Sequence, residues 1–159
     1  MKRAALISIL SALLAAKAEI DELERQNPHG AALLRDSTHG HDRFDARGSC
    51  AIELEIRIAA AAGRALDPVR PLIIDHFQIL LRSSQDEAIR SLRNRGVKER
   101  HLREEAEFDH LVVQAHARLN RWKFLKITRA AHIDEALAVI RTLVDRISPP
   151  EPNTNHNRS

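Results

Sequence analysis

The feature that most constrains the fold is a shortage of residues that interrupt helices. The 159-residue chain contains five glycines and six prolines, and none of them falls between Val97 and Ser148. Its apolar residues are mainly Ala, Leu, Ile and Val, and aromatic residues make up 3% of the chain. Because alanine and leucine favour helices while glycine and proline end them, this composition predicts helices packed on helices. A chain of this length has room for one core.

We therefore predict an all-α, single-domain helical bundle of five or six helices over residues 1–148. The polar, proline-rich sequence at 149–159 is predicted to be a disordered tail. Within residues 50–66, four apolar residues alternate with charged ones, as in a strand: Ile52, Leu54, Ile56 and Ile58. No other segment offers a partner strand to satisfy its backbone, so this segment is also predicted to be a helix.

The N-terminal segment, MKRAALISILSALLAAKAEI, has two interpretations. Its basic start, apolar stretch and Ala-Lys-Ala sequence at 16–18 are typical of a signal peptide, which would imply a periplasmic or secreted protein lacking residues 1–18. Apolar residues also recur every seven positions, past that cleavage site. We favour a long amphipathic helix over residues 1–26. Its stripe forms the predicted interface for a second copy or a helical partner: Leu6, Ile9, Leu13, Ile20 and Leu23.

The apolar stretch of this segment is too short and too polar to span a membrane, and we expect a cytoplasmic protein. Residues 27–49 are predicted to be a long irregular loop, with one helical turn at 31–35. In this loop His39 and His41 are weak candidates for metal ligands, because their spacing matches no ordered zinc site. We therefore expect no metal and no other cofactor. An exported, histidine-rich metal-binding protein is kept as an alternative.

Two signals divide the second half of the chain. Ser84 and Glu87 have the spacing of a capping box, which predicts a new short helix that ends at Gly96. Two more helices are expected between Val97 and Ser148, with a break between Asn120 and Thr128. The last should bury a stripe of five residues: Ile133, Leu137, Ile140, Val144 and Ile147. His76 also falls on an apolar stripe, so we expect a core histidine.

The most unusual charge pattern is RSLRNRGVKERHLREEAEFDH at 90–110, which begins basic and ends acidic. Pairs four residues apart neutralise most of it: Asp86 with Arg90, Glu99 with Arg103, Arg100 with Glu104, and Arg103 with Glu107. This pairing leaves Arg93, Arg95 and Lys98 around Gly96, at an expected helix N-terminus. Cations and free amides at such an end favour an anion, so we predict a phosphate-binding site. The formal charge of +3 permits a polyanionic partner without requiring one.

A second basic segment interleaves Trp122 and Phe124 with four cations: Arg118, Arg121, Lys123 and Lys126. Aromatic rings among cations are suited to stacking on unpaired bases. The alternative is a helix junction in which the aromatic rings enter the core while the charges stay in water.

Catalytic motifs are weak throughout the sequence. There is no glycine-rich phosphate loop. An arginine and a histidine separated by four to six residues, as at Arg95 and His101, resemble the HEPN-type ribonucleases. That spacing recurs three more times, and Gly96 takes the position where that family usually has a polar residue.

These observations favour a non-enzymatic accessory or regulatory protein in a nucleic-acid-bound assembly. It would contact phosphates through the two basic segments and partners through the first helix. A protein–protein adaptor with an incidental basic face is the main alternative, and a HEPN-like ribonuclease is a minor one.

Overall fold

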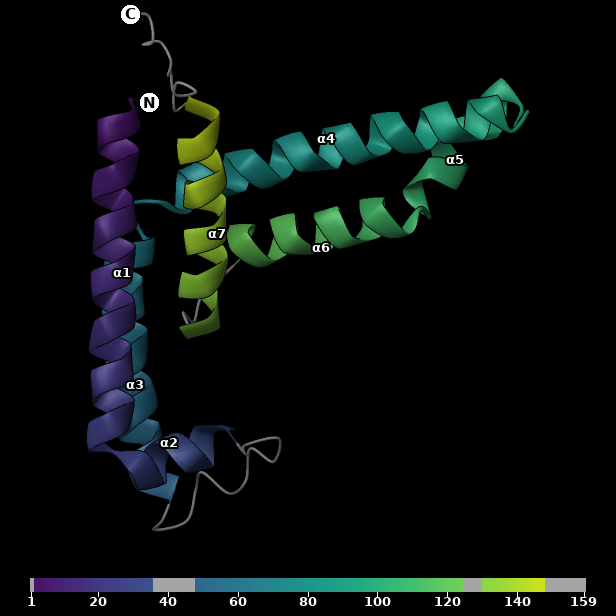
Figure 1. Cartoon of the computed structure of the whole chain (residues 1–159). Coiled ribbons are helices and arrows are strands. Elements are labelled where there is room, and N and C mark those ends of the chain that lie inside the picture. The colour runs from purple at the N-terminus through teal and green to yellow at the C-terminus, as the bar shows by residue number, and fades with distance from the viewer. Residues whose placement is uncertain (1, 36–47, 125–129, 148–159) are drawn as a thin grey trace, which may run out of the picture. The chain divides into compact units, whose positions relative to one another are not determined.

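The computed structural model describes residues 2–35, 48–124 and 130–147, and every regular element in these ranges is a helix (Figure 1). The all-α class predicted from composition is therefore confirmed. The described ranges hold seven α-helices and one 3-10 helix, more than the five or six expected. None of these helices is long and apolar enough to cross a membrane. The elements are α1 (Arg3–Gln26), α2 (Pro28–Arg35), α3 (Gly48–Leu66), α4 (Arg70–Asn94), η2 (Glu99–His101), α5 (Leu102–Glu107), α6 (His110–Lys123) and α7 (Ala130–Ile147).

The described helices group into two compact units, where the chain length led us to expect one bundle. Unit 1 contains α1, α2, α3 and α7, and unit 2 contains α4, η2, α5 and α6. In unit 1, α1 packs along both α3 and α7, while α2 packs on α3. In unit 2, α4 and α6 pack side by side, and η2 with α5 forms the connection between them (Figure 1).

The seven-residue stripe of α1 lies in the core of unit 1. Leu6, Leu13 and Ile20 are 1%, 0% and 2% exposed, and Ile9 and Leu23 are half-buried. Because α1 packs against α3 and α7, these side chains are already covered within the chain. This corrects the prediction that they form an exposed partner interface. The spacing identifies an apolar face, but it does not say whether the same chain or a second one covers that face.

The end of α1 falls at Gln26, as predicted, and a second helix follows at once. The Asn27 side chain donates a hydrogen bond from Nδ2 to the Leu23 carbonyl at 2.9 Å, which satisfies an orphan carbonyl of α1. Pro28 takes the first position of α2, where its missing N–H costs nothing. The predicted irregular loop is therefore wrong over 28–35, where eight residues are helical instead of a single turn.

Residues 48–66 form α3, which confirms the helical interpretation of the alternating segment. In a strand, its four alternating apolar residues would all share one face. In the helix they are spread around the axis. Leu54 and Ile58 are buried, at 2% and 7% exposure, while Ile56 is 64% exposed.

α4 is one continuous helix of 25 residues. The break predicted from Ser84 and Glu87 is wrong. A serine inside a helix costs only about 0.5 kcal/mol relative to alanine, and no glycine or proline falls between 72 and 94. Burial of one apolar face on both sides of Ser84 outweighs that cost. His76 lies on this face at 8% exposure, which confirms the expected core histidine. The apolar residues buried on the face are Ile73, Phe77, Ala88 and Leu92.

Gly96 ends α4 in the predicted left-handed conformation, with φ of +85°. The Val97 N–H donates to the Leu92 carbonyl at 3.1 Å, and the Gly96 N–H donates to the Arg93 carbonyl at 3.1 Å. These two bonds define a Schellman motif, which satisfies terminal carbonyls of α4. Val97 packs on a small core formed by α4, α5 and α6, whose buried members are Ala88, Leu92, Leu102, Ala106 and Val112.

A second turn, at 108–109, separates α5 from α6, and we did not predict it. Asp109 caps α6, because its Oδ1 accepts a hydrogen bond from the Leu111 N–H at 2.9 Å. The break predicted between Asn120 and Thr128 agrees with the end of α6 at Lys123. Four residues of the predicted α7 stripe are buried, and the fifth, Ile147, is 44% exposed.

We predict that Leu13→Ala lowers the free energy of unfolding by about 3–5 kcal/mol, because it leaves a cavity in the core of unit 1. Leu14 is the matched control, since it is the next residue of the same helix and is 43% exposed. Leu14→Ala should cost less than about 1 kcal/mol. Urea titrations followed by circular dichroism measure both changes. Equal effects of the two substitutions would show that the stripe is not a core.

We predict that Gly96→Ala destabilises unit 2 by about 1–2 kcal/mol, the cost of a left-handed conformation for a residue with a Cβ. No described atom lies within 4 Å of an added Cβ, so the cost is one of backbone conformation and not of crowding. Gly96→Asn should cost less, because asparagine tolerates this conformation. Hydrogen-exchange protection of α4 and α6 amides measures the difference. A Gly96→Ala variant as stable as the wild type would contradict the left-handed conformation assigned to residue 96.

Candidate functional site

Several exposed bases of unit 1 are paired with acids of the same unit. Lys17 contacts Asp134 at 2.7 Å, and Arg64 contacts Glu19 at 2.9 Å. Arg25 donates hydrogen bonds to the Glu22 carboxylate, which hold the pKa of Glu22 below its ordinary value and raise the pKa of Arg25. Basic side chains that are already bound to acids within the chain are poorly suited to bind an external anion.

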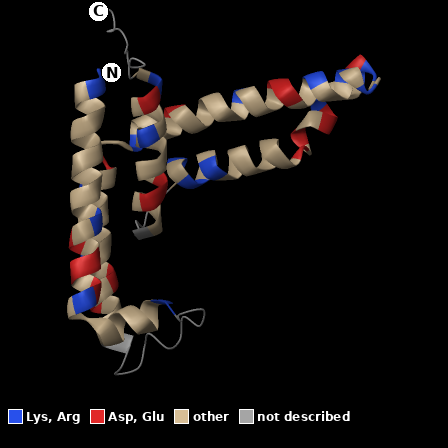
Figure 2. Ribbon diagram, in the orientation of Figure 1, with Lys and Arg blue, Asp and Glu red and all other residues tan. Residues whose placement is uncertain are grey.

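In unit 2, basic residues outnumber acidic ones at the turn between α4 and α5. Figure 2 shows them as the blue residues at that end of α4. Residues 90–103 contain six bases and one acid, Glu99. The excess of positive charge in this short stretch is larger than the formal +3 of the whole chain. All six bases are exposed. The turn is therefore the candidate site for an anionic partner.

The ion pairs at this turn differ from those predicted. Arg93, which we expected to be left over, donates to both carboxylate oxygens of Glu99, at 2.6 and 3.0 Å. Arg103 reaches Glu107 at 3.8 Å, as predicted. The predicted pairing of Glu99 with Arg103 is wrong, because Glu99 lies in the 3-10 helix η2 while Arg103 lies in α5, and the Glu99 carboxylate is bound to Arg93 instead.

Four bases therefore remain without an ion pair among the described residues, and we call them the elbow cations: Arg90, Arg95, Lys98 and Arg100. Arg95 and Lys98 were predicted to be members of this site. Arg90 and Arg100 were missed, because the assumed pairs with Asp86 and Glu104 do not form. Arg100 instead donates from Nε to His101 Nε2 at 3.2 Å, a bond to a neighbouring ring that leaves its charge uncompensated.

The predicted helix N-terminus does not contribute to this site. The residues after Lys98 form η2, a 3-10 helix of three residues, and α5 has six residues. The first turn of α5 also carries Glu104 and Glu105, which already suit the positive end of its dipole. The capacity to bind an anion at this turn therefore rests on the elbow cations.

The second basic segment is only partly described. Arg118, Arg121 and Lys123 are exposed on α6, and Lys126 lies outside the described residues. These bases occupy the end of α6 opposite the Gly96 turn, about 20 Å along the helix axis, so the two basic segments do not converge. Trp122 is 0% exposed and cannot stack on a base, whereas Phe124 is 73% exposed. The alternative of an aromatic ring entering the core is thus correct for Trp122 alone.

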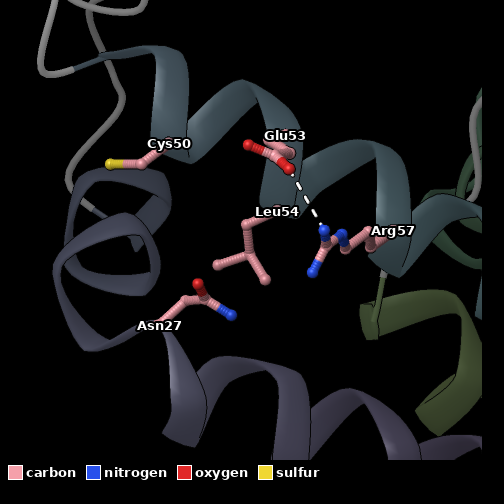
Figure 3. Close-up of a pocket in the computed structure, with 5 residues that line it drawn as sticks. All are labelled: Asn27, Cys50, Glu53, Leu54 and Arg57. Carbon is pink, nitrogen blue, oxygen red and sulfur yellow. Dashed lines mark hydrogen bonds and ion pairs between the residues drawn. The ribbon is translucent and has the colours of Figure 1, made fainter.

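Unit 1 contains a small cavity of about 140 Å³, lined by Asn27, Cys50, Glu53, Leu54 and Arg57 (Figure 3). The Cys50 thiol points away from the Glu53 carboxylate, which pairs with Arg57 at 3.1 Å. The cavity therefore brings no carboxylate to the thiol. No cluster of three metal-ligating side chains occurs in the described ranges, and His39 and His41 lie outside them.

No protein-family model, no curated protein and no solved structure matches the chain.

Proposed function

We propose that this protein is a non-enzymatic accessory or regulatory protein that acts in a nucleic-acid-bound assembly, where the elbow cations contact phosphates. The observation that carries the proposal is the group of four exposed bases around the Gly96 turn, with no ion pair among the described residues. Arginine and lysine in this state can neutralise phosphates and release the counterions bound to them.

The surroundings of the elbow cations favour contact with the nucleic-acid backbone over reading of bases. Glu104, Glu105 and Glu107 follow on α5, and their charge would be repelled by phosphates on both sides of a groove. Contact through the turn alone avoids that repulsion. Because phosphates carry no base information, the expected binding is independent of sequence.

A second candidate is a protein–protein adaptor whose basic turn is incidental. It is favoured by Phe108, which is 83% exposed beside the cap of α6. An exposed aromatic side chain at a hydrogen-bonded turn is a typical anchor in a protein interface. The two candidates differ in one measurement, because an adaptor needs no salt-sensitive affinity for nucleic acid.

We predict that Arg95→Glu with Lys98→Glu weakens binding to mixed-sequence duplex and single-stranded DNA by a similar factor on every sequence. The slope of log affinity against log salt should flatten by about 0.9 for each duplex phosphate that the variant no longer neutralises. Arg141→Glu with Arg146→Glu is the matched control, since both residues are exposed on α7 of unit 1. Fluorescence anisotropy at several salt concentrations measures both pairs. Wild-type protein with no salt-sensitive binding near physiological ionic strength would overturn the proposed function.

We further predict that Glu99→Gln strengthens binding. The substitution removes the acid from the turn and releases Arg93, which Glu99 holds at 2.6 Å. The salt slope should steepen by about 0.9 if Arg93 then neutralises one more phosphate on duplex. Glu53→Gln in unit 1 removes a similarly exposed acid, paired with Arg57, and should leave the affinity unchanged. A weaker affinity of the Glu99→Gln variant would contradict this prediction, because it would mean that the Arg93–Glu99 ion pair holds the binding site in shape.

A further inference from the structure

The face of α6 that points away from its buried side carries exposed apolar side chains. Val112, Ala115, Leu119 and Trp122 are buried on one side of the helix. At 100° per residue, Val113 and Ala117 lie together on the other side, one turn apart. Val113 is 52% exposed, and Ala117 is also exposed. Phe124, at 73% exposure, follows the same stripe two turns later.

Charge is segregated along this part of unit 2. Four acids precede or begin α6, no acid, lysine or arginine occurs from His110 to Ala117, and three bases follow. Figure 2 shows the red residues on α5 and the blue ones at the far end of α6. The acids are Glu104, Glu105, Glu107 and Asp109, and the bases are Arg118, Arg121 and Lys123.

This segregation suits the dipole of α6 itself, so the charges alone require no partner. The uncharged middle of the helix is what a partner would cover, because it contains the exposed Val113 and Ala117. Any partner that runs along this stripe must place bases near the acidic end and acids near the basic end. A second copy of the same helix, running in the opposite direction, meets both conditions.

We propose that two copies of the chain associate through an antiparallel pairing of α6 with α6. A two-fold axis at the level of residue 115 places Val113 of each copy on Ala117 of the other, so a larger side chain faces a smaller one. It also brings Asp109, the cap of each α6, level with Arg121 of the other copy, and the acids of α5 directly precede Asp109 in the sequence. The contact is isologous, because each copy contributes the same surface. A parallel pair would instead place like charges together.

A cavity beside this stripe can accept a side chain of the second copy. It has a volume of about 520 Å³, and it is lined by Gln85 of α4, Glu107 of α5, and Val112, Val113, His116, Ala117 and Asn120 of α6. His116 Nδ1 and Asn120 Nδ2 lie 3.2 Å apart and form a polar border. Three apolar residues, Val112, Val113 and Ala117, bordered by polar ones form a mixed surface of the kind found in protein interfaces.

The pairing uses none of the elbow cations, so it is independent of the proposed function. Protein that binds nucleic acid but stays monomeric at high micromolar concentration would overturn the pairing alone, and a dimer that binds no nucleic acid would overturn the proposed function alone. Sedimentation velocity of the full chain at high micromolar concentration should show a dimer that dissociates on dilution. Wild-type protein that remains monomeric overturns the pairing.

Val113→Arg should convert the dimer to a monomer, while circular dichroism and melting temperature stay close to wild type because the side chain is half exposed. Ile79→Arg is the matched control, an apolar residue of unit 2 with 48% exposure on α4. It should leave the dimer intact. A dimer that survives Val113→Arg overturns the proposal.

Charge reversal tests the antiparallel direction, and it remains informative if Val113→Arg misfolds. One variant carries Arg118→Glu with Lys123→Glu, so both ends of its α6 are acidic. A second variant carries Glu104→Lys with Glu107→Lys, so α5, which leads into α6, becomes basic like the far end of α6. Each should be monomeric alone, since like charges then meet, and an equimolar mixture should recover the dimer mass. A mixture that stays monomeric, or variants that dimerise alone, overturn the antiparallel pairing.

Discussion

The reversal of the chain at Gly96 is the constraint on which unit 2 and its candidate site depend. A left-handed residue at this position allows the Val97 and Gly96 amides to bond back to α4. The same turn brings Val97 onto the apolar cluster that α4 shares with α5 and α6. It is followed by η2, in which Glu99 bonds back to Arg93 and Arg100 is left without an acid partner among the described residues. The turn therefore shapes both the packing of unit 2 and part of the charge that it leaves exposed.

Local sequence signals predicted the helix boundaries where no tertiary contact opposed them. The seven-residue stripe identified α1, whose predicted end at residue 26 is correct, and Gly96 marked the end of α4. The prediction failed where tertiary burial outweighed a local preference. Ser84 has the pattern of a cap, yet α4 continues through it because the faces on both sides are buried. The turn before α6 was missed because its signal, one aspartate before an apolar run, was overlooked.

The candidate site was predicted less well than the fold, because ion pairs depend on details of the backbone. Glu99 lies in η2 and pairs across the turn with Arg93 instead of with Arg103. Asp86 and Arg90 lie four residues apart on the unbroken α4 and still form no pair, so this spacing permits an ion pair without requiring one. The residue type alone also did not predict which side chains are buried. Trp122 and Phe124 are both aromatic and lie two residues apart, but only Trp122 is buried. Heptad spacing likewise located an apolar face of α1 without identifying its neighbours.

The discontinuity of unit 1 has a consequence for synthesis on the ribosome. α1 packs against both α3 and α7, but α7 is translated only after all of unit 2. Unit 2 is one uninterrupted stretch whose helices pack on one another, so it can complete its packing while unit 1 is still lacking a helix. During that interval the face of α1 that α7 will cover is exposed to water and to other nascent chains. Premature termination before residue 130 would make this exposure permanent, and a molecular chaperone is the cellular factor best placed to shield it.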